Sequence, residues 1–144
     1  MQNNTQALKE KTFYDLHKCK NILVLPNAWD AASARIFEQA GFSAIGTTSA
    51  GIATSLGFAE PEKISLDEML KAIERIVKSV SVPVTADIEA GYASTAAGVA
   101  DTIKKVIATG AVGVNLEDTP GSNDNAIQEI AIQVERNRCE QPWH

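Results

Sequence analysis

Short apolar runs alternate along the chain with longer amphipathic stretches. The apolar runs are rich in β-branched residues, and each ends in polar or acidic residues. This alternation is typical of βα units around a parallel sheet, whose strands are buried on both faces. The sequence therefore predicts an α/β fold with strands at Ile22–Pro26, Ser43–Thr47, Val82–Asp87 and Val112–Glu117.

Helix signals fill the intervals between these strands. Asp30 is expected to cap a helix that runs to Gln39, and Gly41 supplies a left-handed residue after it. Ser65 and Glu68 form a capping box ahead of a stretch with apolar residues at helical spacing. Further helices are predicted at Thr5–Lys18, from Ser94 or Thr95 to Gly110, and at Asn125–Asn137.

The segment that follows the second strand, Ser49–Ile64, is rich in Gly, Ala and Ser. We expect an extended functional loop there. The stretch Thr47–Gly51 at its start offers hydroxyls and backbone N–H groups without bulky side chains, a combination that can cradle a carboxylate or phosphate. A connection of small residues without a ligand is the simpler alternative.

Composition and charge narrow the function classes. The chain is 44% hydrophobic and 22% charged, as in ordinary globular domains, and its formal net charge is −5. The negative charge and the scattered basic residues argue against a nucleic-acid partner. No apolar stretch approaches the ~20 residues that cross a bilayer, and the N-terminus lacks the apolar core of a secretion signal. We expect a cytoplasmic protein without a membrane partner, in which Cys19 and Cys139 are free thiols.

Acidic residues follow the third and fourth predicted strands. Asp87 and Glu89 end the third strand, and Glu117 and Asp118 end the fourth. If these strands are parallel neighbours, their carboxylates meet at one end of the sheet and repel one another unless a cation lies among them. Hard oxygen donors favour Mg²⁺ or Mn²⁺, which leaves coordination positions for an acid substrate. The alternative is that each acid is solvated or caps the following helix.

Other polar residues at strand ends give weaker signals. Trp29 is more often a packing residue and Asp30 more often a helix cap than a catalyst. His17 lies in the predicted N-terminal helix and His144 is the last residue. Because neither histidine has a partner that suggests a triad, a Ser-His-Asp hydrolase is not expected.

Three segments together resemble a known family: LPNAWDAASARIFEQAGFSAIGTTSAGIATSLG, VPVTADIEAGY and GVGVNLED. In this order and spacing they are similar to the phosphoenolpyruvate mutase/isocitrate lyase superfamily, over about residues 21–120. The resemblance implies a TIM-type (β/α)₈ barrel and an Mg²⁺-dependent lyase or phosphonomutase-like enzyme. Such enzymes act on 2-oxo or 2-hydroxy acids and make or break C–C or P–C bonds through an enolate-like species.

The resemblance also implies roles for particular residues. Asp87 looks like the main metal-binding Asp of the family, Glu89 takes the second acidic place of that motif, and Glu117 looks like the Glu of the LED motif. Glu60 falls where many members carry an Asp that reaches the metal through water. Asp87 and Glu117 are thereby the implied catalytic residues. The implied substrate-binding residues are Trp29, Asp30, Thr48, Ser49 and Ala50.

Chain length separates this protein from a complete barrel, which typically needs about 250 residues. We expect a single partial barrel over residues 1–144, with about four βα units, an N-terminal helix within residues 1–20 and an irregular tail at 138–144. Two sheet edges would then lack a neighbouring strand, so a homo-oligomer is predicted. A fragment and a gene shortened by a frameshift remain as alternatives.

Three functional alternatives follow from the residues. One is a non-catalytic half-barrel that oligomerises and keeps metal affinity. Another is a metal-dependent aldolase barrel for 2-oxo-3-deoxy sugar acids, against which the ADIEAGY motif argues. The third is isocitrate lyase activity, which is not expected because the KKCGH segment of those enzymes does not follow Glu117.

Overall fold

The computed structural model describes residues 2–59, 63–119 and 127–138. At its centre lies a parallel sheet with strand order β1-β2-β3-β4. Each strand pairs with the next in chain order, with Asn27 opposite Gly46 and Asp87 opposite Asn115. The strands are β1 (Asn27–Ala28), β2 (Ile45–Thr47), β3 (Val84–Asp87) and β4 (Gly113–Asn115). The predicted α/β architecture with parallel strands is confirmed.

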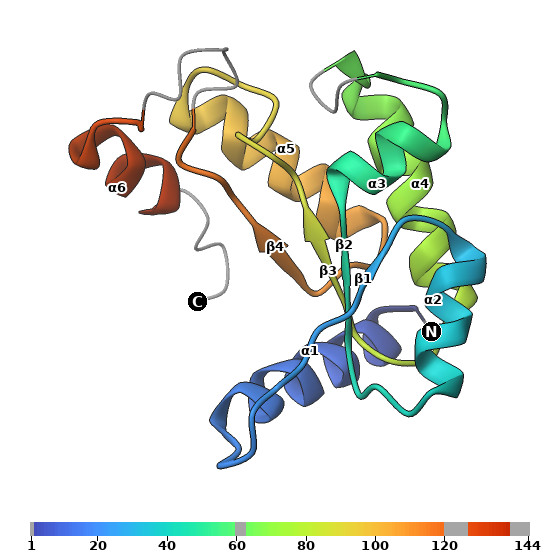
Figure 1. Ribbon diagram of the computed structural model, residues 1–144. Helices are drawn as coiled ribbons and strands as arrows, with labels where there is room; N and C mark the ends of the chain where they lie inside the picture. Colours follow the sequence, from blue (N-terminus) through green and yellow to red (C-terminus); the bar gives the residue numbers. More distant parts are fainter. Residues whose placement is uncertain (1, 60–62, 120–126, 139–144) are drawn as a thin grey trace.

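Helices follow the strands and pack against one another in chain order. They are α1 (Gln2–Lys18), α2 (Ala31–Gln39), α3 (Ser49–Ser55), α4 (Leu66–Ser79), α5 (Ala96–Ala108) and α6 (Ile130–Arg138). Contacts join α2 to α4, α4 to α5, and α5 to α6. In Figure 1, α1 lies below the strands, and α6 lies beside α5 on the side away from α4. The arrangement is that of part of a TIM-type barrel.

Local capping chemistry explains where the helices begin. Asp30 and Ser65 cap α2 and α4 with capping boxes, and Thr95, rather than Ser94, caps α5. After α2 the chain turns at Gly41, whose φ of +92° lies in the left-handed region that glycine adopts without steric cost. The predicted helix starts are therefore confirmed at these three positions.

The hydrophobic core lies between the sheet and helices α4 and α5. It contains strand residues and the apolar faces of both helices, among them Ile45, Val84, Ala86, Met69, Ile73, Ile76, Val99, Ile103 and Val106. The central strands β2 and β3 are almost fully buried. Each of these two strands pairs with a strand on either side, so the sheet fixes the positions of the residues at their ends.

The first predicted strand is wrong in position. The run Ile22–Pro26 is not part of the sheet, in which β1 comprises only Asn27 and Ala28. Ile22 and Val24 are 90% and 59% exposed. The physical reason is position: β1 lies at the edge of the sheet, and the run contacts β2 at its last residue, where Gly46 N donates to the Pro26 carbonyl oxygen at 3.0 Å. The second, third and fourth strands also prove shorter than predicted.

Two further expectations are corrected. Ser49–Ile64 is not an extended loop throughout, because α3 occupies Ser49–Ser55. The Thr48 side chain caps this helix by accepting a hydrogen bond from Gly51 N, and Ile52 is buried in the core. The last helix begins at Ile130 rather than Asn125, and the described residues before it, 127–129, are not helical.

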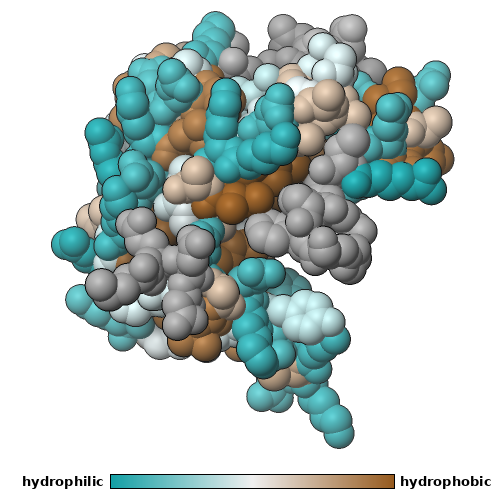
Figure 2. Space-filling model, turned by 180° about the vertical axis from the view of Figure 1, so that it is seen from behind, coloured by the Kyte–Doolittle hydropathy of each residue, from teal (hydrophilic) through white to brown (hydrophobic). Residues whose placement is uncertain are grey.

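The surface carries apolar side chains outside the core. Figure 2 shows a hydrophobic band along a hollow in the middle of the back face, with hydrophilic side chains around it. Cys19 is an exposed free thiol, as predicted, whereas Cys139 lies outside the described residues. Within the part of the chain that the structure describes, no helix is long and apolar enough to cross a membrane.

Candidate active site

The carboxyl ends of β3 and β4 bring the predicted acids to one edge of the sheet. Asp87 is the last residue of β3, and Glu117 comes two residues after β4 ends. Beyond the strands the two segments stay paired, because Glu117 N donates to the Glu89 carbonyl oxygen at 2.8 Å. The sequence prediction that Asp87, Glu89 and Glu117 share one end of the sheet is confirmed.

Hydrogen bonds from two neighbouring segments fix the Asp87 carboxylate. Its Oδ2 accepts from Ser49 N at 3.0 Å and from Ser49 Oγ at 2.9 Å. Its Oδ1 accepts from Glu89 N at 3.2 Å. The Asp87 backbone N–H in turn donates to Thr47 Oγ1 at 2.9 Å. Asp87 is thus oriented by the end of β2, the start of α3 and the turn that follows β3.

That turn, residues 88–93, has an unusual backbone. Glu89 and Tyr92 take φ values of +53° and +56°, and Gly91 takes +86°. Left-handed conformations are unfavourable for residues with a Cβ, so surrounding contacts must hold them. The turn directs the Tyr92 hydroxyl to Glu89, where it donates to Oε1 at 3.2 Å.

The negative charge of nearby carboxylates acts on the side chain of Tyr92. Its pKa lies far above the ordinary value near 10, first because the phenol is buried and then because of the negative charge of Glu89. The hydrogen bond to Glu89 and the charge of Asp87 raise the pKa of Tyr92 further. Tyr92 therefore stays a neutral hydrogen-bond donor, and both carboxylates act on one phenol.

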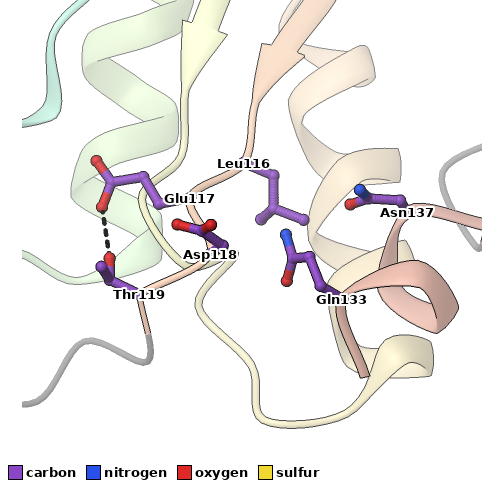
Figure 3. A pocket seen from close by; sticks show the side chains of 6 residues that line it. All are labelled: Leu116, Glu117, Asp118, Thr119, Gln133 and Asn137. Carbon is purple, nitrogen blue, oxygen red and sulfur yellow. Dashed lines mark hydrogen bonds between the residues drawn. The ribbon is translucent and has the colours of Figure 1, made fainter. Parts of the chain in front are cut away.

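Glu117 lies beside a cavity of about 470 Å³ between the end of β4 and α6. Its Oε2 accepts from Thr119 Oγ1 at 3.1 Å. The cavity is lined by Leu116, Glu117, Asp118, Thr119, Gln133 and Asn137. Figure 3 shows that Glu117 extends toward Thr119 and away from the two amide side chains of α6.

The donor set fits a hard divalent cation in its chemistry. Asp87, Glu89 and Glu117 supply carboxylate oxygens, which are the ligands that Mg²⁺ and Mn²⁺ prefer. Across the described ranges, no three His, Cys, Asp or Glu side chains stand grouped as ligands of one ion. The structure brings Asp87 and Glu89 together, while Glu117 keeps its contact with Thr119. Glu60 lies outside the described residues.

The predicted substrate-binding residues fall into two groups. Trp29 and Ala50 are exposed, and Trp29 lies close to the start of α3, because a Cβ added at Gly51 would be 3.0 Å from Trp29 Cβ. Thr48 and Ser49 already have structural contacts, as the cap of α3 and as donors to Asp87.

Asp30 belongs to the second group. It caps α2, and the hydrogen bond from Ser33 N, at 2.7 Å, lowers the pKa of its carboxyl below the ordinary value. Its negative charge lies at the helix N-terminus, where the helix dipole favours it. The structure therefore gives Asp30 a structural contact within its own helix.

Sequence reasoning missed the contacts that two residues of this region make. Thr47 bonds the backbone of Asp87, and Arg136 bonds the turn after β3 although it is far away in sequence. Thr47 carried a weak signal, since it is a polar residue at the end of an apolar run. Arg136 carried none, because a basic residue on a short helix is usually solvated.

The sheet is parallel, capped helices lie between its strands, and acidic residues lie at adjacent carboxyl ends of the strands. These features define the class of protein as a βα-barrel type with an acidic site at the strand ends. Residues 13–139 match the phosphoenolpyruvate phosphomutase family. The chain belongs to this family, which confirms the resemblance seen in the sequence.

Individual relatives agree with this assignment. The chain is 35% identical over 104 residues to 2-methylisocitrate lyase of Escherichia coli K12, which covers 72% of this chain and 35% of that protein. A crystal structure from Burkholderia cenocepacia J2315, of a protein classed as a lyase or mutase, superposes with a TM-score of 0.88 at 39% identity. It covers 95% of this chain and 49% of its own.

A third relative is 2,3-dimethylmalate lyase, a member of the PEP mutase/isocitrate lyase superfamily. Its crystal structure superposes with a TM-score of 0.79 at 28% identity and covers 94% of this chain and 47% of its own. The chain thus spans about half, or less, of the length of the relatives it matches.

Proposed function

We propose that this chain forms a Mg²⁺- or Mn²⁺-dependent site for a small 2-oxo or 2-hydroxy acid, and that it acts in making or breaking a C–C or P–C bond. The observation that supports this most is the Asp87 carboxylate, which Ser49 and the Glu89 N–H hold at a strand end adjacent to that of Glu117, in a chain from this family. Strand ends of this kind are where barrel enzymes place their catalytic groups.

Asp87, Glu89 and Glu117 would hold the cation, with Glu60 as a further ligand through water. A bound ion of this kind polarises a 2-oxo group and stabilises negative charge on its oxygen. Other residues of the chain would position these ligands. Ser49 orients Asp87 through two hydrogen bonds, and neutral Tyr92 donates to Glu89.

The substrate would lie over the ends of β1 and β2. Thr48 caps α3, and Ser49 and Ala50 begin it. The Thr48 hydroxyl and the Ala50 backbone N–H would bind the substrate carboxylate, while the N–H and hydroxyl of Ser49 stay on Asp87. Trp29 and Asp30 follow β1 on the adjacent segment, so their side chains would border the same substrate. A polar site at the strand ends suits the binding of small dicarboxylic acids.

A second candidate function is binding of the metal and acid without turnover. The favouring observation is length, because about half of each relative's chain has no counterpart among these 144 residues. Turnover therefore separates the two candidates.

The test is an assay of the full chain with Mn²⁺ on oxaloacetate, methylisocitrate and phosphonopyruvate. We expect consumption of at least one of them, and its loss in Asp87→Asn. Binding of oxalate with Mn²⁺ but without turnover of any of the three would favour the second candidate. Absence of both oxalate binding and turnover would contradict both.

We further propose a cytoplasmic homo-oligomer. β1 and β4 are the outer strands of the sheet, and Ile22 and Val24 beside β1 are exposed. Exposed strand edges favour pairing with another chain. A second copy would place its β4 beside β1, and its β1 beside β4. Light scattering that gives twice the mass of one chain supports this, and a mass of 15.4 kDa contradicts it.

A further inference from the structure

We propose that Arg136 is a positioning residue: it fixes the turn of residues 88–93 and so sets Glu89 against Asp87. Arg136 lies on α6 and is 3% exposed. Its Nη2 donates to the carbonyl oxygen of Ala90, and also to that of Ala93 at 3.2 Å. One guanidinium thus grips the turn at two carbonyls that flank Gly91 and Tyr92.

The turn is held from outside by two segments, of which the first is the stretch after β4, where Glu117 N donates to the Glu89 carbonyl oxygen at 2.8 Å. Glu89 and Tyr92 both hold left-handed φ values, which a chain keeps only where neighbouring groups enforce them. Inside the turn, Gly91 N bonds the Ile88 carbonyl oxygen at 2.8 Å. Arg136 supplies the complementary restraint from a helix more than 40 residues further along the chain.

The restrained residues are those next to the proposed metal ligands. Ala90 directly follows Glu89, whose backbone N–H donates to Asp87 Oδ1 and whose side chain accepts from Tyr92. A shift of the Ala90 carbonyl group would therefore move Glu89 relative to Asp87. In its role toward the cation, this inference rests on the proposed function.

The chemistry of the guanidinium suits this task. Its planar fork donates in fixed directions, whereas a lysine ammonium is a compact point charge on a flexible stem. Burial of a guanidinium is costly unless it is hydrogen-bonded, and Arg136 Nε has no acceptor in the described part of the chain. The two carbonyls of the turn are therefore the contacts that hold the Arg136 side chain in place.

A purely structural role would be to attach α6 to α5, which it contacts. The two roles differ in what changes when Arg136 is replaced. An attachment role affects the amides of α6 and the overall stability. A positioning role affects the amides of residues 88–93 and the metal affinity at a distance.

The experiment combines amide hydrogen exchange of the metal-free full chain with Mn²⁺ titration by electron paramagnetic resonance. The variants are Arg136→Met, Arg136→Lys and, as matched control, Arg138→Met, which makes the same change at an exposed residue of the same helix. For Arg136→Met we expect exchange of the Glu89 and Gly91 amides to be about tenfold faster or more, as for loss of a charge-assisted hydrogen bond. We expect the Kd for Mn²⁺ to rise roughly ten- to a hundredfold.

Arg136→Lys should fall between wild type and Arg136→Met, and Arg138→Met should match wild type. Equal exchange at Glu89 and Gly91 in wild type and Arg136→Met would overturn the inference. If Arg136→Met does not fold, Arg136→Lys decides: faster exchange in the turn supports the inference, and wild-type exchange overturns it. Lack of Mn²⁺ affinity in wild type would contradict the proposed function alone, because the exchange measurement is made without metal.

Discussion

The ends of β3 and β1 show how one type of sequence signal leads to two outcomes. Both strands were predicted from an apolar run that ends in polar residues. β3 has a strand on each side, and its last residue, Asp87, is held by hydrogen bonds from Ser49 and Glu89. β1 has a neighbour on one side only, and Ile22 and Val24 before it are exposed. The strand at this edge of the sheet comprises two residues, whereas the central strand β3 comprises four.

The largest effect is expected from a substitution at the carboxyl end of β3. Asp87→Ala should abolish measurable Mn²⁺ binding, with an affinity loss of at least about a hundredfold, because the central ligand of the proposed site is gone. Titration followed by electron paramagnetic resonance measures it. Asp101→Ala, an exposed residue of α5, is the control and should bind as wild type does.

Asp87→Asn accompanies this test, since it keeps the shape of the side chain and the acceptor for Ser49. It should fold as wild type does and still bind Mn²⁺ weakly. Wild-type Mn²⁺ affinity in either Asp87 variant would count against the metal assignment.

A matched pair of valines sharpens the comparison at the level of packing. Val84→Ala on β3, where the side chain is 1% exposed, should lower the free energy of unfolding by about 2 kcal/mol. Val24→Ala ahead of β1, where the side chain is 59% exposed, should change it by less than about 0.5 kcal/mol. Urea unfolding of both variants measures the difference, and equal losses would show that residues 22–26 are buried in solution.

Asp30→Ala tests the segment after β1 at the residue that caps α2. Loss of the cap of α2 should lower the free energy of unfolding by about 1 kcal/mol at neutral pH. Because the pKa of Asp30 is lowered in the folded state, its contribution is present above the unfolded pKa near 4 and is lost as the pH falls below it. The difference between variant and wild type should therefore shrink in acid. A constant difference from pH 7 to pH 3 would contradict this role of the carboxylate.

The smallest expected effect concerns Tyr92 in the turn after β3. Its folded pKa is raised, so the folded state keeps the proton more tightly than the unfolded state. The stability linked to Tyr92 is thus complete below the unfolded pKa near 10 and is lost as the pH rises above it. Thermal unfolding between pH 9 and 11 should show a steeper fall for wild type than for Tyr92→Phe, and parallel curves would oppose the assigned burial.

Local sequence signals predicted the fold best where one segment carries the whole cause. The caps at Asp30 and Ser65 and the turn at Gly41 depend on a few adjacent residues, and all are confirmed. The exposure of Ile22 and Val24 before β1 could not be foreseen, because it depends on which strand lies beside them. The helix at Ser49–Ser55 was hidden by a composition that suits loops and helices alike.

The candidate site divides in the same way. The sequence predicted that Asp87, Glu89 and Glu117 share one end of a parallel sheet, and the structure confirms this. It does not group the three carboxylates as ligands of one ion among the described residues. The grip of Ser49 on Asp87 and of Arg136 on the turn depends on side-chain directions across distant segments. Such contacts leave no periodic pattern in the sequence.

The central claim is that the strand-end acids bind a cation together with a 2-oxo acid. Isothermal titration calorimetry of oxalate, an enolate mimic, with and without Mg²⁺ tests it most directly. We predict that oxalate binds in the presence of Mg²⁺ and not in its absence. Oxalate binding that is the same in both conditions, or absent from both, would contradict the claim.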